Sequence, residues 1–322
     1  MKSPTFWQDS ASPLGWLLAP LGWAYAGATG WRLAHGNPWK APVPVICVGN
    51  LTAGGAGKTP IVRDLTRRLR AAGRNAGILS RGYGGTALGP LKVDPARHDA
   101  ALVGDEPLLL ARDAPCWVAR DRAAGAQAMV ADGIDIIVMD DGLQNPSLVQ
   151  DLAIIVADGR AGFGNGRAIP AGPLRESIEA GIRRAAALIV SGRDQSGLIQ
   201  RYSTRIKTLQ ASVTIREPLP STPLLAFAGI GRPEKFQATL VEAGANIVAF
   251  QPFADHHAYS SAELSALANR AGELGAQLVT TEKDWVRLDT EWRNRIKPIA
   301  IDIAWSDEAA ITALLDSVTR GG

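Results

Sequence analysis

A glycine-rich loop ending in lysine and threonine is the segment whose residue types and spacing most clearly predict chemistry. Residues 49–59 read GNLTAGGAGKT and lie between a β-branched run at 45–48 and a helical pattern from about 60 to 72. Glycines let backbone N–H groups turn toward phosphate oxygens, and the first turn of a helix adds a favourable dipole. Lys58 would then reach the β- and γ-phosphates of a nucleotide, and the Thr59 hydroxyl would bind Mg²⁺.

The loop matches the final part of the Walker A pattern, with Thr52 standing where the strict pattern has glycine. The alternative is a glycine-rich turn between a strand and a helix, carrying a surface lysine. Because a strand and a helix flank the loop as a phosphate site requires, we predict that it binds nucleotide. The predicted binding residues are Thr52, Ala53, Gly54, Gly55, Ala56, Gly57, Lys58 and Thr59.

A second candidate site is the apolar run 134–139, which is followed by two carboxylates, Asp140 and Asp141. This is the form of a Walker B strand, in which a carboxylate at the end of the strand holds the metal ion or its waters. Alone, such a pattern is often a helix cap or a turn. After a Walker A loop in the same unit we predict a metal site made by Thr59, Asp140 and Asp141. The spacing does not distinguish which aspartate is the direct ligand.

Strands alternate with helices in the part of the chain that must hold these residues, so we predict an α/β domain with a mostly parallel, P-loop NTPase-like sheet. The predicted strands are 45–48, 76–79, 116–118, 134–139, 152–157 and 187–190. Helices are predicted at about 60–72, 107–112, 123–131 and 177–184.

A loosening of this pattern near residue 200, followed by three prolines before residue 224, predicts a linker. A second alternation then predicts a smaller α/β lobe, with strands at 224–228, 247–250 and 277–280 and helices at 233–243, 261–274 and 307–318. The predicted organisation is an N-terminal helix at 1–40, a P-loop kinase domain at 41–200, a linker at 201–223 and the smaller lobe at 224–322.

Composition limits the class of protein. The chain has 322 residues, of which 46% are hydrophobic, so it can bury a sizeable core and is not intrinsically disordered. Its net charge of +3 gives no support to nucleic-acid binding, and we expect no nucleic-acid partner. The only cysteines, Cys47 and Cys116, lie inside apolar runs. We expect buried, reduced thiols of a cytosolic protein rather than a disulfide framework or a zinc site.

The N-terminal segment raises the question of a membrane. Residues 14–31 carry no charge, and Trp16, Trp23 and Trp31 are spaced to lie near one face of a helix. Tryptophan favours the headgroup boundary, where its ring is buried and its N–H stays hydrated. We therefore predict a helix lying on a membrane surface. The alternatives are a helix packed on the protein's own body, a transmembrane span, which Pro20 and several glycines disfavour, and a signal peptide.

Together with this N-terminus, a set of short motifs resembles the tetraacyldisaccharide 4'-kinase family, the lipid A 4'-kinases of Gram-negative bacteria. Any one motif is weak evidence, but they follow in order along nearly the whole chain. They are VGNL to TP (48–60), SRGYGG (80–85), GDEP (104–107), DDGLQ (140–144), IPAGPLRE (169–176), FADHH (253–257) and TTEKD (280–284).

The resemblance implies Mg²⁺- and ATP-dependent phosphorylation of the 4'-hydroxyl of a tetraacylated glucosamine disaccharide 1-phosphate. It also implies a peripheral protein on the cytoplasmic face of the bacterial inner membrane. At the matching positions it implies that Asp105 and His256 activate the hydroxyl, since a carboxylate hydrogen-bonded to an imidazole is a tunable base. Without the family, Asp105 would be a helix cap and His256 an ordinary surface or core histidine. The sequence does not show that the two residues meet in space.

Five residues of the matching loops are predicted substrate contacts, with ordinary loop hydrogen bonding as the alternative: Arg81, Tyr83, Gln144, Arg175 and Glu176. The segment 281–284 is expected to shape the second lobe more than to do chemistry. Its lysine stands one place too late for the guanine motif of a GTPase, so guanine specificity is unsupported. The rival functions are a soluble P-loop kinase or ligase acting on a small metabolite, and a nucleotide-switched membrane-binding ATPase without a phosphoryl acceptor.

Overall fold

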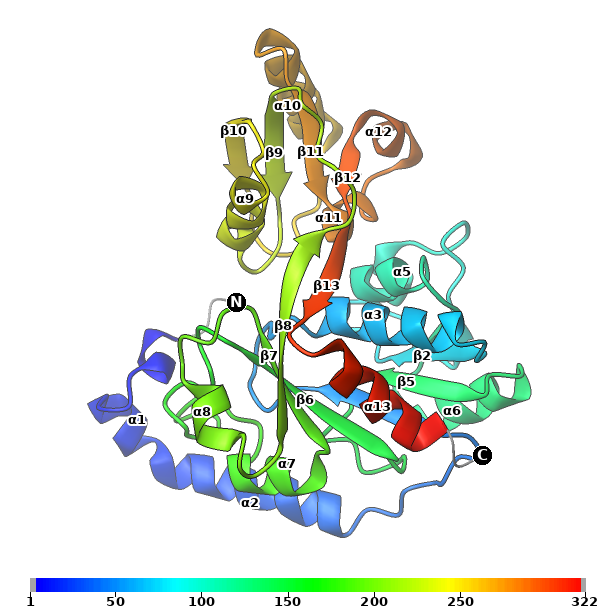
Figure 1. Ribbon diagram of the computed structural model, residues 1–322, viewed down its shortest axis with the longest axis vertical. Coiled ribbons are helices and arrows are strands. Elements are labelled where there is room, and N and C mark those ends of the chain that lie inside the picture. Colours follow the sequence, from blue (N-terminus) through cyan, green and yellow to red (C-terminus); the bar gives the residue numbers. More distant parts are fainter. Residues whose placement is uncertain (1–3, 320–322) are drawn as a thin grey trace.

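Two sheets, each flanked by helices, form two lobes of unequal size (Figure 1). The computed structural model describes residues 4–319, so residues 1–3 of the predicted N-terminal segment and 320–322 of the predicted second lobe lie outside the described residues. The α/β class and the mostly parallel large sheet are as predicted. Among the described residues the large sheet has nine strands and the small sheet four.

The large sheet places the two candidate motifs on neighbouring strands. Its order is β13-β8-β7-β6-β1-β5-β2-β4-β3, and β1 pairs in parallel with both β5 and β6. The carboxyl ends of these strands therefore meet at one edge of the sheet, where ligands bind in open α/β folds. The strands are β1 (Val45–Gly49), β2 (Ala76–Ser80), β3 (Leu91–Lys92), β4 (Cys116–Val118), β5 (Ile136–Asp140), β6 (Leu152–Asp158), β7 (Ala187–Ser191), β8 (Lys207–Ile215) and β13 (Ile301–Trp305).

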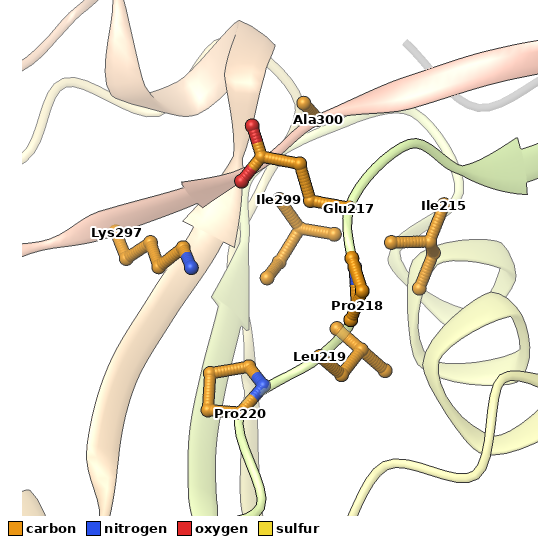
Figure 2. Close-up of a pocket in the computed structure, with 8 residues that line it drawn as sticks. All are labelled: Ile215, Glu217, Pro218, Leu219, Pro220, Lys297, Ile299 and Ala300. Carbon is orange, nitrogen blue, oxygen red and sulfur yellow. The ribbon is translucent and has the colours of Figure 1, made fainter.

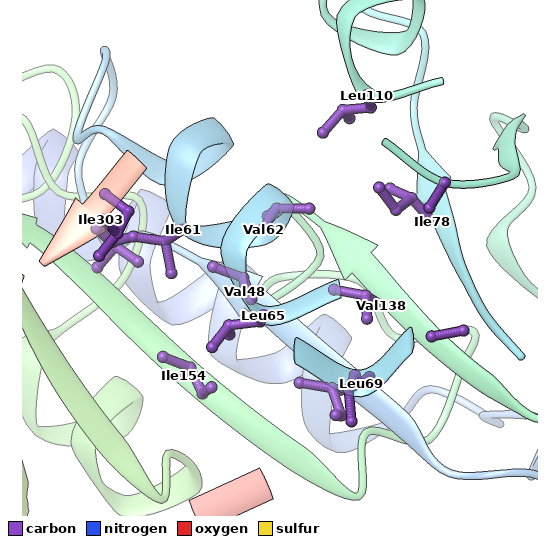
Figure 3. Close-up of a cluster of buried hydrophobic side chains, with 14 of the residues drawn as sticks. Val48, Ile61, Val62, Leu65, Leu69, Ile78, Leu110, Val138, Ile154 and Ile303 are labelled. Carbon is purple, nitrogen blue, oxygen red and sulfur yellow. The ribbon is translucent and has the colours of Figure 1, made fainter. Parts of the chain in front are cut away.

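Helices cover both faces of this sheet. On one face, α3 (Lys58–Ala71) buries Ile61, Leu65 and Leu69 against strand residues such as Val138 and Ile154, as Figure 3 shows. Other helices that contribute to that core include α5 (Asp105–Leu110) and α13 (Glu308–Thr319). The short helix α4 (Ala100–Val103) precedes α5. The opposite face is covered by α6 (Arg122–Ala131), α7 (Ile178–Arg184) and α8 (Leu198–Tyr202).

The small lobe has a parallel sheet with the order β10-β9-β11-β12. Its core centres on Phe227, which is fully buried and makes edge-on ring contacts with Phe253 and Tyr259. The strands are β9 (Leu224–Ala228), β10 (Ile247–Pro252), β11 (Gln277–Thr281) and β12 (Lys297–Ile299). The helices are α9 (Pro233–Glu242), α10 (Ser261–Glu273), α11 (Glu282–Trp285) and α12 (Thr290–Arg295).

The structure differs from the predicted boundaries of the second lobe at both ends. The first part of the predicted linker 201–223 is not a linker, because residues 201–202 end α8 (Leu198–Tyr202) and 207–215 form β8 of the large sheet. At the other end, residues 301–319 form β13 and α13 of the large lobe. The small lobe is thus an insertion at 216–300, between two paired strands: β13 runs antiparallel to β8, with Ile301 opposite Ile215.

The two chain crossings between the lobes lie beside each other. They enclose a hollow of about 10 Å³, lined by residues such as Ile215, Pro218 and Ile299 (Figure 2). Such a volume holds at most about one water molecule, so this junction is packed rather than a ligand site.

The N-terminal segment forms the helices η1 (Thr5–Gln8), α1 (Pro13–Leu17) and α2 (Ala19–Ala34) along the outside of the large lobe. Small side chains face inward: Gly15 and Gly22 lie close to the backbone of residues 168–171. Large apolar side chains face outward, including Trp16, Trp23 and Trp31, which are 61%, 70% and 66% exposed. Among residues 4–319 no helix is long and apolar enough to cross a bilayer.

Candidate nucleotide and phosphoryl-acceptor site

The phosphate loop joins β1 to α3 as predicted. Gly57 caps α3 with a φ of 81°, a left-handed conformation that favours glycine, and a Cβ there would lie 2.7 Å from Ser191 Oγ. Lys58 Nζ donates to Asn50 Oδ1 at 3.1 Å and lies 3.5 Å from Asp141 Oδ1. The lysine is therefore held within the loop and points toward the end of β5.

Segment 168–176 braces the phosphate loop from outside. Ala53 N donates to Pro173 O and Arg175 N donates to Leu51 O, each at 2.7 Å. The Asn50 amide closes the loop internally by donating to Thr52 O and Gly54 O. These bonds fix the backbone conformation before any nucleotide is bound.

The two carboxylates after β5 have different surroundings. Asp141, with a φ of 56°, accepts two hydrogen bonds from Arg175 Nη1, at 3.0 and 3.1 Å. Burial would raise its pKa, but Lys58 and Arg175 outweigh that effect and hold the pKa of Asp141 below its usual value. Asp141 is thus an ionised group already neutralised by two cations.

Asp140, by contrast, is 4% exposed and its Oδ1 is buried with no hydrogen-bond partner. Burial, with the Glu106 carboxylate adding to the effect, raises the pKa of Asp140 to about 7. An unpaired buried carboxylate oxygen next to a phosphate loop has the donor chemistry that Mg²⁺ prefers. The residues present therefore fit a magnesium ion, with Asp140 better placed to serve it than Asp141.

Asp105 and His256 come from different lobes and meet. Asp105 begins α5 in the large lobe, and His256 lies in the loop after β10 of the small lobe. His256 Nδ1 is 3.0 Å from Asp105 Oδ2. Asp105 is 4% exposed, whereas the His256 side chain is 41% exposed, so the imidazole is the member of the pair that faces solvent.

The charge of Asp105 is stabilised by its neighbours. Burial would raise its pKa, but the hydrogen bond with His256 and the charges of Lys283 and Arg287 lower the pKa of Asp105 to about 2. At neutral pH the carboxylate is therefore ionised. It favours the His256 tautomer with its proton on Nδ1. In that tautomer Nε2, which lies 3.7 Å from Asp255 Oδ1, carries the lone pair that can accept a hydrogen bond.

The other predicted contact residues divide into two groups. Arg81 and Tyr83 lie exposed after β2, and the Tyr83 ring is 6.5 Å from the His256 ring, between centroids. Gln144 and Glu176 are internal braces, because Gln144 Nε2 donates to Asn50 O and to Glu176 Oε1. Glu176, 2% exposed, also accepts two hydrogen bonds from Arg184.

A cavity of about 230 Å³ lies between α2 and residues 166–177. Trp23 and Ala19 line it on one side and Leu174 and Glu176 on the other. It connects the outward-facing N-terminal helix with the segment that carries Arg175.

Three residues of the site were not among those predicted from sequence. Asn50 stands in the loop sequence but outside the part that the Walker pattern specifies. Lys283 and Arg287 approach Asp105 from the small lobe, at 3.6 and 3.2 Å. Lys283 belongs to the motif at 281–284, whereas Arg287 has no local sequence signal, because its importance depends on contacts with distant segments.

Comparisons with known proteins identify the family of the chain. The model of the family tetraacyldisaccharide-1-P 4'-kinase matches residues 14–320. Tetraacyldisaccharide 4'-kinases of Rhodospirillum centenum and Gluconacetobacter diazotrophicus are each 51% identical, over 100% and 98% of this chain and 98% of each relative. Among solved structures, LpxK from Aquifex aeolicus in complex with ATP is 26% identical with a TM-score of 0.77, covering 95% of this chain and 99% of that one. The chain belongs to the tetraacyldisaccharide 4'-kinase family.

Proposed function

We propose that this protein transfers the γ-phosphoryl group of ATP to the 4'-hydroxyl of a tetraacyldisaccharide 1-phosphate, a lipid A precursor, at the cytoplasmic face of the inner membrane. Family membership over the whole chain supports the reaction. The observation that carries the proposal is the contact between Asp105 of the nucleotide lobe and His256 of the small lobe. A pair of this kind can accept the proton that a hydroxyl nucleophile loses when it attacks the γ-phosphoryl group.

In this proposal the phosphate loop and Lys58 bind and orient the nucleotide phosphates. Thr59 and Asp140 would hold Mg²⁺, with Asp141 beside them, and when bound the ion would neutralise charge on the phosphate oxygens. Asp105 and His256 act as one proton acceptor for the sugar hydroxyl. The ionised carboxylate fixes the imidazole through Nδ1, and the pair together takes up the proton that the hydroxyl loses.

In this proposal, the N-terminal helices form the surface of the protein that faces the lipid. Their inner face is made of small residues that pack on the large lobe, and their outer face carries tryptophan and leucine side chains. Exposed aromatic residues on a helix lying along the body of a protein are suited to the headgroup boundary of a bilayer. The cavity beside Trp23 would then receive part of the acylated substrate as it leaves the membrane.

The test is transfer of radiolabelled γ-phosphate to a panel of acceptors, with and without vesicles. We expect label in the acylated disaccharide 1-phosphate, in a form that acid hydrolysis assigns to the 4'-position. Label in a water-soluble sugar or metabolite instead would support a soluble kinase. Release of inorganic phosphate with no labelled acceptor would support a nucleotide-switched ATPase.

A further inference from the structure

Arg287, in the turn that follows α11, braces the loop that carries His256. Its guanidinium is nearly buried, with 7% of the side chain exposed. Both terminal nitrogens donate to Gly229 O at 3.1 Å, and Nη1 also lies 3.4 Å from His257 O. Gly229 O is the same oxygen that accepts the His256 backbone N–H, at 3.1 Å. Arg287 thus braces the His256 loop directly at His257 O and indirectly through Gly229 O, which lies in the loop after β9.

The same side chain also reaches the other member of the pair. Arg287 Nε lies 3.2 Å from Asp105 Oδ2, the oxygen that contacts His256 Nδ1. This Nε is buried and makes no hydrogen bond within residues 4–319, so its interaction with the Asp105 carboxylate is electrostatic. One arginine of the small lobe therefore touches the loop of His256 and the carboxylate of Asp105.

Arg287 is itself held in place by a fully buried carboxylate. Asp284 Oδ1 lies 3.3 Å from Arg287 Nη1. Asp284 also accepts hydrogen bonds from Gly229 N at 3.0 Å, Tyr259 Oη at 2.7 Å and Thr281 Oγ1 at 2.6 Å. A buried network of hydrogen bonds around one carboxylate fixes the side chains that it joins in one arrangement. The end of the motif 281–284 is therefore part of the support for the candidate base.

Arg287 also contributes to the electrostatic surroundings of Asp105. The cations that face Asp105 are His256, when protonated, Lys283 and Arg287. Each of them also lies near another carboxylate: Asp255 is 3.7 Å from His256, Glu106 is 3.4 Å from Lys283 and Asp284 is 3.3 Å from Arg287. Of the two permanent cations, Arg287 is the closer to Asp105 and the more deeply buried. Its charge is therefore screened less by water.

We propose that Arg287 is a positioning residue for phosphoryl transfer, which aligns His256 with Asp105 and, together with Lys283, balances the charge of the Asp105 carboxylate. The inference rests on the proposed function, in which that pair accepts the proton of the sugar hydroxyl. Arg287 does not touch the reacting atoms, and its effect passes through the geometry and charge of the pair. Small errors in the alignment of a catalytic pair have large effects on rate, up to about 100-fold for a displacement of about 1 Å.

Three substitutions separate the two effects. Arg287→Met removes the donors and the charge, Arg287→Gln keeps a donor for Gly229 O without the charge, and Arg287→Lys keeps the charge and one donor group. We expect Arg287→Met to lower kcat by about 10- to 100-fold, with KM for ATP nearly unchanged. We expect Arg287→Lys to recover most of that loss. Arg295→Met, at an exposed arginine stacked on Trp292 of the same lobe, is the matched control.

The pH dependence of kcat/KM gives a readout that a purely structural role would not move. With the pKa of Asp105 held at about 2, its protonation does not limit activity in an ordinary assay range. Loss of the Arg287 charge raises that pKa, so in profiles extended into the acid range the activity of Arg287→Met and Arg287→Gln should begin to fall at a higher pH than that of the unaltered enzyme. The profile of Arg287→Lys should stay close to that of the unaltered enzyme. Unshifted profiles in the Met and Gln variants would overturn the electrostatic part of the proposal.

A double-variant cycle keeps the test sharp even if the Met variant is less stable. Because Arg287 acts through His256, Arg287→Gln should cost much less in the His256→Ala background than in the unaltered enzyme. Equal fold-losses in both backgrounds would show that Arg287 acts elsewhere and would overturn the inference. If His256→Ala and Asp105→Asn both keep a normal kcat, the proposed role of the pair fails instead, independently of any Arg287 variant.

Discussion

Lys58 lies where a phosphate group would replace its present partners. In the structure it contacts Asn50 and Asp141, and both contacts keep its ammonium inside the phosphate loop. Lys58→Ala should lower kcat by on the order of 10³-fold, because a lost phosphate clamp removes charge stabilisation in the transition state. Single-turnover phosphoryl transfer measures this loss. The control is Lys92→Ala, at an exposed lysine paired with Asp132, which should keep normal activity and thermal stability. Near-normal phosphoryl transfer by Lys58→Ala would contradict the assignment of the loop as a phosphate site.

Asp105 and His256 should behave as one catalytic unit. Each alanine variant should lower kcat by roughly 10²–10⁴-fold, the usual range for loss of a general base. The double variant should be little worse than the poorer single variant, because both residues serve one proton-transfer step. Steady-state kinetics at saturating ATP tests this, with KM for ATP as the internal control. Fully multiplicative losses would mean that the two residues do separate work.

For single residues, the sequence predicts which side chains belong to the candidate site better than it predicts which of them contact one another. The phosphate loop, Asp140 and Asp141 were found because their spacing is local and follows a strand. The pairing of Asp105 with His256 follows from family motifs, and the distance between them is a property of the assembled lobes. Arg287 was not predicted at all, since a single arginine next to a short helix has no pattern, and its role depends on Gly229, His257 and Asp105 together.

Among the elements, α1 and α2 have an unusual division of side chains, with small residues inward and large apolar residues outward. Replacing Trp16, Trp23 and Trp31 together by Gln should weaken binding to anionic vesicles and raise KM for the lipid acceptor more than KM for ATP. Vesicle co-sedimentation and kinetics measure both effects. The fold should be unaffected, because these side chains do not pack in the core.

The control for this variant is Val241→Gln, at another exposed apolar position on α9 of the small lobe. It should leave vesicle binding unchanged. Alkaline extraction should release the full-length protein from membranes, since an interfacial helix binds reversibly. Retention after extraction, or unchanged vesicle binding in the triple variant, would count against the helix as the membrane surface.

Element prediction succeeded where hydrophobic runs are continuous. Strand β9 was predicted with its bounds, and α3 within two residues at each end. Strand β8 was missed because its partly exposed face gives the polar alternation at Gln210, Ser212 and Thr214, which was interpreted as a linker. Strand β13 contains the charged Asp302 and was missed because its main support is its pairing with β8, far away in the sequence.

In the molecule as a whole, a buried ion triad joins the two lobes. Arg63 of α3 donates to Glu282 of α11 at 2.7 and 2.9 Å and also pairs with Asp113. Arg63 and Glu282 side chains are 3% and 6% exposed. Removing one member of such a group leaves buried charge unpaired, which typically costs about 3–5 kcal/mol. Helix α3, which follows the phosphate loop, is therefore joined through Glu282 to the segment of the small lobe that carries Lys283 and Arg287.

Arg63→Met should lower the free energy of unfolding more than Glu282→Gln, because it leaves two carboxylates without their cation. Urea unfolding measures both, and Arg205→Met, in an exposed pair with Glu179, should have a much smaller effect. Burial would raise the pKa of Glu282, but Arg63 outweighs burial and lowers it. The stabilisation is therefore present above the unfolded value of 4.5 and is lost as the pH falls through the folded value. Arg63→Met should flatten this acid dependence, and an unchanged slope would exclude the pair as its source.

The insertion of the small lobe between β8 and β13 has a consequence for biosynthesis. When residue 215 leaves the ribosome, Ile303, Trp305 and Leu314 have not yet been made. These residues complete the apolar core between α3 and the sheet. Roughly a hundred further residues must be translated first, which takes about 5–20 s at ordinary elongation rates. During that interval the nascent nucleotide lobe exposes apolar surface and a free edge on β8, while the inserted lobe can fold by itself. Slow or paused translation through 216–300 should therefore increase aggregation and demand for chaperones, and a circular permutant that begins at β13 should be relieved of both.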